Sequence, residues 1–249
     1  TIRGGGLKNY NVLIIPEGSA GRYMSSFGAG GVSALKEFAS GGGTIVTISG
    51  ASVFAALKDV GLTSAKLVGS DDDEQKGKSD DDKKDTSPTP TPTPKPGIKA
   101  DDPIVVETPS DRTDGIAPSL PPIASPSANA NKVPEALPGS IMRATVDRTT
   151  YLTYGVDRSE MPVLLASGYF FRYSKEGTNA LVFDANPKKP LTISGFVWEG
   201  NTERLLKGTA YVIGESMGSG NVVLFAEDPF FRGMTRANTR PFFNSILFN

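Results

Sequence analysis

Two serines stand where a strand is expected to turn sharply into a helix, and they are the first residues that suggest chemistry. The segment Thr47-Ile48-Ser49-Gly50-Ala51-Ser52 follows a β-branched run and precedes a short apolar helix. In several enzyme folds such a turn presents a nucleophile above the sheet, next to backbone amides that stabilise an oxyanion. Ser49 or Ser52 is therefore a candidate nucleophile. The alternative is a tight turn in which Ser52 caps the helix.

The composition limits what such a serine can do. The 249 residues include no histidine and no cysteine. The chain therefore holds no Ser-His-Asp triad, thiol nucleophile, disulfide, zinc–thiolate site or His-ligated metal. A serine needs an adjacent base, so only a lysine or carboxylate base would remain. We expect no enzymatic activity from this chain alone, and neither a metal nor another cofactor in it.

Carboxylates and glycines supply further candidates. Glu227 and Asp228 follow an apolar run that is typical of a central strand, at the end where open α/β sheets bind ligands. Paired carboxylates there suit acid–base chemistry, whereas Asp228-Pro229 also matches the start of a helix. The glycine-rich segment 17–31 suits phosphate binding on backbone amides, but it lacks the Gly-Lys-Ser/Thr ending of a P-loop. A surface loop is the better interpretation of that segment.

The charge pattern excludes other functions. With 26 basic and 27 acidic residues the net charge is −1, which gives no electrostatic reason to expect nucleic acid or an anionic membrane as partner. No stretch approaches the roughly 20 apolar residues of a membrane span. Aspartate triplets at 71–73 and 80–82 suggest calcium, but three adjacent carboxylates cannot all face one ion. A solvated acidic linker is the better interpretation.

The elements that must position these residues alternate between strand and helix at the start of the chain. Apolar runs at 10–16 and 44–49 are typical of strands buried on both faces, and helices are expected at 32–39 and directly after Gly50. This order is typical of right-handed βαβ units with parallel strands. The sequence therefore predicts an α/β fold.

Composition divides the chain into three parts. Residues 1–69 form the first half of the α/β domain, 70–137 form a low-complexity acidic and Thr/Pro-rich insertion, and 138–249 form the second half. The insertion is too polar to offset its ordering entropy, and only 104–106 resembles a brief strand. Neither half has enough elements for a covered sheet, so we expect both to build one sheet. In the second half we expect strands at 141–146, 163–166, 180–183, 192–198, 209–213 and 221–226, and a helix at 240–248.

Several short motifs in both halves carry a family resemblance. The chain resembles the C-terminal region of bacterial zinc carboxypeptidases of peptidase family M14, a domain similar to class I glutamine amidotransferases. The motifs are Gly42-Gly43-Thr44-Ile45-Val46, Ala51-Ser52-Val53-Phe54-Ala55, Pro138-Gly139-Ser140-Ile141-Met142-Arg143, Val146-Asp147, Leu152-Thr153-Tyr154-Gly155, Ser194-Gly195-Phe196, Leu206-Lys207-Gly208-Thr209-Ala210, Gly218-Ser219-Gly220-Asn221-Val222-Val223-Leu224-Phe225, Asp228-Pro229-Phe230-Phe231-Arg232 and Phe243-Asn244-Ser245-Ile246-Leu247.

The resemblance implies a flavodoxin-like three-layer sandwich around a mostly parallel sheet. Amidotransferases of this class place a cysteine at the elbow, near Ile48 or Ser49 here, and use a histidine and a glutamate further on. Cysteine and histidine are both missing from this chain, so the resemblance implies no release of ammonia from glutamine. The zinc of such a carboxypeptidase would lie in a peptidase domain before Thr1. The opening Thr1-Ile2-Arg3 carries no methionine or signal pattern, and we expect a piece of a longer protein.

We therefore expect a non-catalytic accessory domain of an exported zinc-carboxypeptidase-like protein, extracellular or periplasmic. It would pack against the peptidase domain, bind a ligand or assemble with other copies of itself. An alternative is a ligand-binding module for a sugar or cell-wall fragment, with Gly18–Gly31, Ser49, Ser52 and Glu227 lining the degenerate active-site crevice. A third hypothesis is a residual serine or carboxylate hydrolase.

Overall fold

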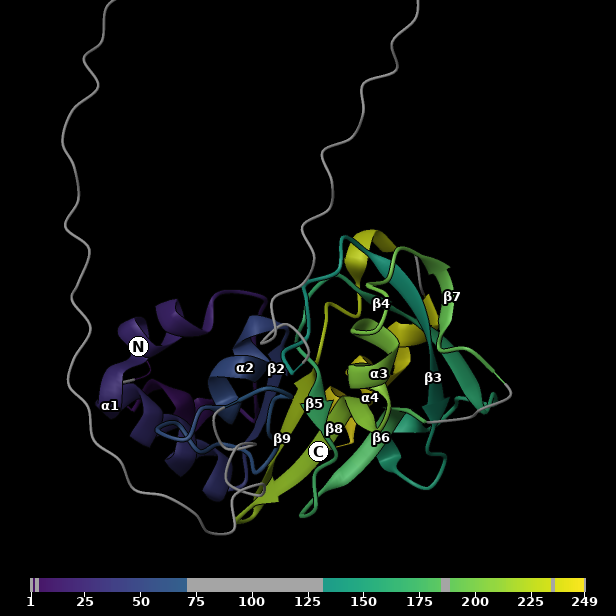
Figure 1. Ribbon diagram of the computed structural model, residues 1–249. Helices are drawn as coiled ribbons and strands as arrows, with labels where there is room; N and C mark the ends of the chain where they lie inside the picture. Colours follow the sequence, from purple (N-terminus) through teal and green to yellow (C-terminus); the bar gives the residue numbers. More distant parts are fainter. Residues whose placement is uncertain (1, 3–4, 71–131, 185–188, 234–235, 249) are drawn as a thin grey trace, which may run out of the picture. The chain divides into compact units, whose positions relative to one another are not determined.

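The computed structural model describes residues 2, 5–70, 132–184, 189–233 and 236–248. The described residues on both sides of 71–131 belong to one compact unit and share a nine-stranded sheet (Figure 1). The aspartate triplets, the Thr-Pro repeat and the expected strand at 104–106 lie outside the described residues. The sheet is therefore built from segments far apart in the sequence.

The first part of the sheet is parallel, as the apolar runs predict. β1 (Val12–Ile15) pairs with β2 (Thr44–Ile48), and β2 pairs with β9 (Gly220–Phe225), which comes from the second half of the chain. All five residues of β2 are buried. A strand without polar alternation is typical of this position, because both of its faces are covered.

Helices lie on both faces of these three strands (Figure 1). The Thr47 hydroxyl of β2 lies 3.0 Å from the Ser52 hydroxyl of α2. Phe225, which is in register with Ile48, packs its ring 5.9 Å from that of Phe242 in α4. Successive side chains of a strand point to opposite faces, so α2 and α4 lie on opposite sides of the sheet. The helices are α1 (Ala20–Ser40), α2 (Gly50–Ala56), α3 (Thr202–Leu206) and α4 (Thr239–Leu247).

Helix α1 begins much earlier than its glycine content predicts. We expected a loop over 17–31, but the chain is helical from Ala20, with one break where Gly28 takes a φ of 56°. Phe27 of α1 packs against Phe54 of α2 with ring centroids 5.4 Å apart. This tertiary packing stabilises a helix that its glycines weaken, and such packing outweighs intrinsic propensity.

The rest of the sheet is antiparallel. The α/β class is confirmed, but the sheet is mixed rather than mostly parallel, because its order is β1-β2-β9-β8-β6-β3-β4, with β5 paired to β8 and β7 to β3. Strands joined by short connections, such as β8 and β9, can pair only as antiparallel neighbours. The remaining strands are β3 (Ser140–Val146), β4 (Glu160–Leu165), β5 (Phe171–Arg172), β6 (Thr178–Phe183), β7 (Thr192–Gly195) and β8 (Thr209–Met217).

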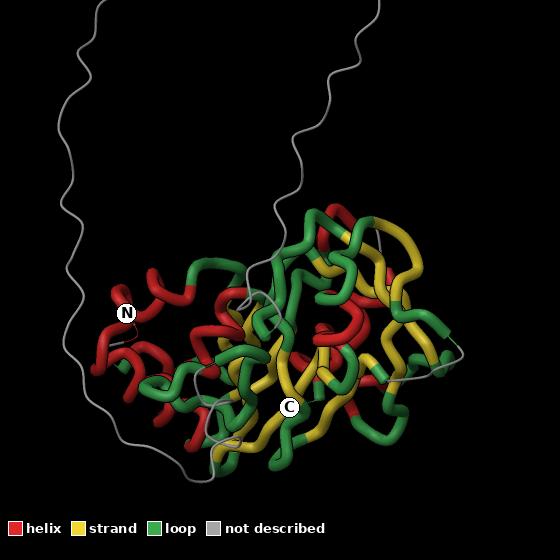
Figure 2. Tube along the Cα trace, viewed as in Figure 1, coloured by secondary structure: helices red, strands yellow, loops and turns green. Residues whose placement is uncertain are grey.

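Most of the expected elements are present. Each predicted strand in the described residues has a counterpart within a few positions, and α4 matches the helix predicted at 240–248. The short β5 and α3 were not predicted. Figure 2 shows the second half as mostly strands and loops. The described residues also include the short 3-10 helices η2 (Gly6–Asn9), η4 (Tyr151–Thr153), η5 (Phe231–Gly233) and η6 (Arg236–Asn238).

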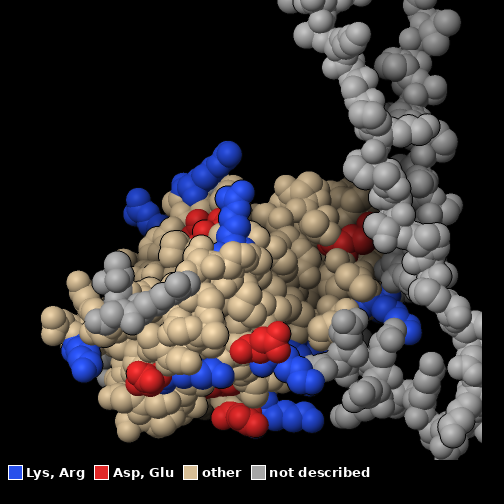
Figure 3. Space-filling model, turned by 90° about the vertical axis from the view of Figure 1, so that its left-hand side faces the viewer, with Lys and Arg blue, Asp and Glu red and all other residues tan. Residues whose placement is uncertain are grey.

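The packed region begins before residue 138, where the sequence places the end of the insertion. Leu137 is buried, and the Trp198 indole N–H donates to the carbonyl oxygen of Ala136 at 3.0 Å. On the face in Figure 3, basic and acidic side chains are interspersed around a large uncharged area. Among the residues that the structure describes, none of the helices combines the length and apolar content needed to cross a membrane.

Candidate functional site

The candidate site is a cavity of about 470 Å³ at the carboxyl ends of the three parallel strands. Each strand leads into it: Glu17 follows β1, Ser49 follows β2 and Glu227 follows β9. Open α/β sheets bind their ligands at this edge. The rest of the wall consists of Gly18, Ser19, Ala136, Ala166, Ser167, Gly168 and Tyr169.

The backbone at Ser49 has the geometry expected of an elbow. Its φ of 54° and ψ of −120° lie in a region that non-glycine residues rarely adopt. Ser49 is held there because its N–H donates to the carbonyl oxygen of Phe225 at 2.9 Å. A Cβ added at Gly50 would lie 1.8 Å from the carbonyl oxygen of Gly18. The residue after Ser49 must therefore be glycine for the loop after β1 to pack against this turn.

The Ser49 side chain lies in the cavity wall with its polar group unused. Ser49 is 3% exposed. Within the described part of the chain its hydroxyl makes no hydrogen bond. This hydroxyl is not one of the fully buried polar atoms that lack a partner, so it is open to the cavity and can bond to a molecule there. It also has no base beside it among the described residues, which leaves it a weak nucleophile.

Ser52, in contrast, does not line the cavity. It is fully buried, and its hydroxyl donates to the carbonyl oxygen of Phe225 at 2.8 Å and lies 3.0 Å from the Thr47 hydroxyl. It ties α2 to β2 and β9. Ser52 also does not cap helix α2, as the alternative interpretation expected, because its hydroxyl bonds to the sheet instead. The sequence could not separate it from Ser49, since both positions flank the same turn.

Glu227 is the most buried carboxylate of the cavity, at 5% exposed. The Ala166 N–H donates to its Oε1 at 3.1 Å. Burial raises the pKa of Glu227, and the negative charge of Glu17 raises it further, whereas hydrogen bonds from Ser167 and Ala166 lower it. The net direction is upward. Glu227 therefore keeps its proton to a higher pH than an exposed glutamate.

Asp228 takes no part in the cavity wall. Its carboxylate accepts the N–H of Phe230 at 2.8 Å, so it stabilises a turn. This agrees with the capping interpretation of Asp228-Pro229, although the next element is the short 3-10 helix η5 rather than an α-helix. Glu227 and Asp228 are therefore not a working carboxylate pair.

The structure adds wall residues that the sequence analysis missed. Of the segment 18–31, only Gly18 and Ser19 line the cavity. Ser167 and Tyr169 come from the loop after β4, which is held over the strand ends because the Val68 N–H donates to the carbonyl oxygen of Phe170 at 2.8 Å. No local pattern marks that loop. Glu17 had a usable signal, because it follows an apolar strand as Ser49 and Glu227 do.

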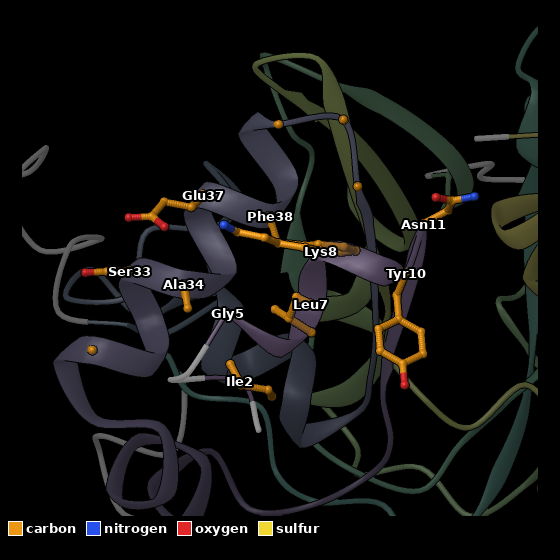
Figure 4. Close-up of a pocket in the computed structure, with 14 residues that line it drawn as sticks. Ile2, Gly5, Leu7, Lys8, Tyr10, Asn11, Ser33, Ala34, Glu37 and Phe38 are labelled. Carbon is orange, nitrogen blue, oxygen red and sulfur yellow. The ribbon is translucent and has the colours of Figure 1, made fainter.

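A second cavity, of about 590 Å³, lies at the opposite ends of β1 and β2 (Figure 4). It lies between η2 and α1. In Figure 4 the Lys8 side chain extends toward α1, where Ser33 and Glu37 lie, whereas Tyr10 points away. Several wall positions are glycines. None of the described residues on this wall is a buried polar side chain, so we place the candidate site in the smaller cavity.

The wall of the smaller cavity is rich in polar and acidic side chains. Its described wall carries two carboxylates, three serine hydroxyls and a tyrosine, and no lysine or arginine. Among the described residues there is no group of three or more side chains that could hold a metal ion. Concave sites with a few convergent polar groups are typical of small-molecule binding.

Comparison with known proteins leaves the chain without an assigned family. No protein-family model matches it, and no curated protein matches it. A solved structure of a cytoplasmic protein from Salmonella typhimurium aligns with 100% of this chain and 74% of its own, at 9% identity and a TM-score of 0.47. A beta-galactosidase from Bacillus circulans sp. alkalophilus aligns with 96% of this chain and 22% of its own, at 11% identity and a TM-score of 0.42.

Proposed function

We propose that this chain is a non-catalytic binding module that holds a small polar ligand, such as a sugar or a cell-wall fragment, in the cavity formed by Glu17, Ser49 and Glu227. One observation carries the proposal. Two buried polar side chains, Ser49 and Glu227, converge on one cavity at the carboxyl ends of the parallel strands. Glu227 accepts hydrogen bonds from Ala166 and Ser167, whereas the Ser49 hydroxyl has no partner within the described part of the chain, so a ligand in the cavity can bond to it.

A ligand screen by thermal unfolding tests this proposal. A ligand present at 100 times its Kd stabilises the folded state by about 2.7 kcal/mol, so binding raises Tm. The panel contains monosaccharides, disaccharides and peptidoglycan fragments. Ser19→Trp places an indole at the cavity mouth and is expected to abolish the shift. The matched control is Ser33→Trp, an exposed serine of the second cavity, which is expected to leave the shift unchanged. A panel without any Ser19→Trp-sensitive shift would contradict the proposal.

A residual serine hydrolase is the second candidate function, and the strained backbone of Ser49 favours it. Such strain clusters at active sites, and this turn is the one that presents nucleophiles in α/β hydrolases. The unpaired hydroxyl argues against it, since an activated serine needs a base. A fluorophosphonate probe separates the two functions. We expect no labelling; labelling that Ser49→Ala removes and Ser52→Ala retains would establish the hydrolase instead.

We further propose, from the motif resemblance, that the module is an accessory domain of a longer exported protein with an M14-type zinc peptidase domain. Its partner would be that peptidase domain, with assembly of several copies as the alternative, and the zinc would belong to the peptidase. The fold would then be a flavodoxin-like three-layer sandwich. Helices on both faces of β1, β2 and β9 support that arrangement.

Intact mass and N-terminal sequence of the protein from its natural source test this wider proposal. We expect a chain that begins several hundred residues before Thr1 and contains histidine-bearing zinc motifs. Binding and peptidase activity should then be measured on the whole protein. A natural chain that begins at Thr1 would contradict the peptidase context and leave the binding module to act alone.

A further inference from the structure

The described wall of the candidate cavity carries acidic side chains and no basic ones. Its described wall contains the carboxylates of Glu17 and Glu227, and no described lysine or arginine forms an ion pair with either of them. The two carboxylates are close enough for the charge of Glu17 to raise the pKa of Glu227. Two carboxylates that repel each other across a concave wall attract a cation placed between them.

The Ser49 hydroxyl is a second, independent sign of a ligand. Ser49 is a buried residue of the same wall, and its hydroxyl is open to the cavity and unpaired within the described part of the chain. A serine hydroxyl has one donor and two acceptor lone pairs. It can therefore hydrogen-bond to a polar group of a ligand whose charged group lies at the carboxylates.

The size and lining of the cavity limit which ligands can fit. A volume of about 470 Å³ lies in the lower part of the range for small-molecule sites. Tyr169 is the aromatic residue of the wall, and an aromatic ring can pack against a cation or a sugar face. The site suits a molecule of the size of one sugar or one amino acid.

We propose that the cavity binds the primary ammonium group of a small polar molecule, an amino sugar or an amino acid derivative, between Glu17 and Glu227, with Ser49 bonded to the rest of the ligand. This inference rests on the proposed binding function and specifies its ligand. An ammonium group offers three donors, and hydrogen bonds between charged partners are roughly twice as strong as neutral ones.

Paired ligands that differ only in charge test the inference by isothermal titration calorimetry at pH 7. The sugar series is glucosamine, glucose and N-acetylglucosamine, and the amino acid series is alaninamide and N-acetylalaninamide. We expect the charged member of one series to bind at least about tenfold more tightly than its neutral analogues. Which series binds identifies the source of the ammonium group. Equal binding of charged and neutral members would overturn the ammonium assignment but would still support a binding module. No binding in either series would also overturn the ammonium assignment. In that case the wider ligand screen tests whether the chain is a binding module at all.

Two carboxylate variants show whether the charge preference comes from this cavity. Glu227→Gln and Glu17→Gln should each weaken the charged ligand about tenfold and leave the neutral analogue unchanged, whereas Glu199→Gln, an exposed control, should change neither. Glu17 is exposed, so its variant is expected to fold even if the buried one does not. Unchanged preference in Glu17→Gln and in folded Glu227→Gln would overturn the assignment.

Discussion

The N–H of Ser49 and the carbonyl oxygen of Phe225 are joined by a 2.9 Å hydrogen bond, which ties the elbow after β2 to the end of β9. The Ser52 hydroxyl donates to the same oxygen at 2.8 Å. Glu227 lies two residues after Phe225. The Phe225 carbonyl oxygen therefore anchors the elbow that carries Ser49 to the strand that leads to Glu227, and sites on such rigid elements are held more accurately than sites on loops.

This arrangement predicts different stability effects for the two serines of the elbow. Ser52→Ala should lower the free energy of unfolding by about 1 kcal/mol, because it removes a buried hydrogen bond while Ser49 still satisfies the Phe225 carbonyl. Ser49→Ala should change it by less than about 0.5 kcal/mol, because its hydroxyl has no partner to lose among the described residues. Urea unfolding of both variants checks this. A larger loss in Ser49→Ala than in Ser52→Ala would contradict the hydrogen-bond assignment.

The close approach of the loop after β1 to the elbow predicts that Gly50 tolerates no side chain. A Cβ there would meet the Gly18 carbonyl at 1.8 Å, so Gly50→Ala should lower the free energy of unfolding by about 3 kcal/mol or more. The control is Gly30→Ala in α1, where a Cβ meets nothing within 4 Å. It should raise stability by about 0.5–1 kcal/mol, since alanine is the better helix former. Thermal unfolding of both variants measures the contrast; similar Tm values would contradict it.

The sequence was sufficient to predict the parallel strands and the elbow, because both depend on local patterns. The run from Thr44 to Ile48 is β-branched at every position, and Ser49-Gly50 is the kind of pair that a sharp strand-to-helix turn needs. The antiparallel half could be divided into strands but not ordered. Its pairing depends on contacts between distant segments, which no local period encodes.

The sequence predicted residues of the cavity wall only where they directly follow a strand. Ser49 and Glu227 were identified as crevice candidates because each follows an apolar run. Ser167 and Tyr169 were missed, since the loop after β4 reaches the strand ends through pairing of residues near Val68 with Phe170. Ser52 was grouped with Ser49 because spacing along the chain does not show which side of a turn faces the sheet.

Glu215 predicts a loss of stability in acid. Its carboxylate accepts the Ser64 N–H at 2.7 Å and the Ser64 hydroxyl at 2.8 Å, and it also accepts the Ser174 hydroxyl at 2.5 Å. Burial raises the pKa of Glu215, but these bonds outweigh it, so the net pKa is lowered. A lowered pKa gives stability above the ordinary glutamate pKa that is lost as the pH falls through the folded value.

The urea midpoint of the unchanged protein should therefore fall on acidification below about pH 5. Glu215→Gln should start about 1–3 kcal/mol less stable at pH 7, because it weakens buried charge-assisted bonds, and should lose less on acidification. Glu199→Gln, at an exposed position, is the control and should follow the unchanged protein. Parallel pH profiles for the unchanged protein and Glu215→Gln would contradict the role of this carboxylate.

The raised pKa of Glu227 predicts that its contribution to stability depends on pH in the opposite direction from that of Glu215. Comparing the two residues separates a carboxylate proposed to bind the ligand from a structural one. The folded pKa of Glu227 is raised, chiefly by burial, so its contribution to stability is complete below the ordinary glutamate pKa and is lost as the pH rises through the folded value. The negative charge of Glu17 also raises the pKa of Glu227, and burial, together with the charge of Glu227, raises the pKa of Tyr211. Position 227 cannot ionise in Glu227→Gln, so the unchanged protein should lose stability relative to this variant as the pH rises from the ordinary glutamate pKa through the folded value. A saturating ammonium ligand should reverse that loss, because it stabilises the charged carboxylate. Urea unfolding of both proteins as a function of pH, with and without the ligand, measures both effects. A stability difference between the unchanged protein and Glu227→Gln that does not depend on pH would contradict the prediction. It would mean that the carboxylate of Glu227 is not the group that the ligand neutralises.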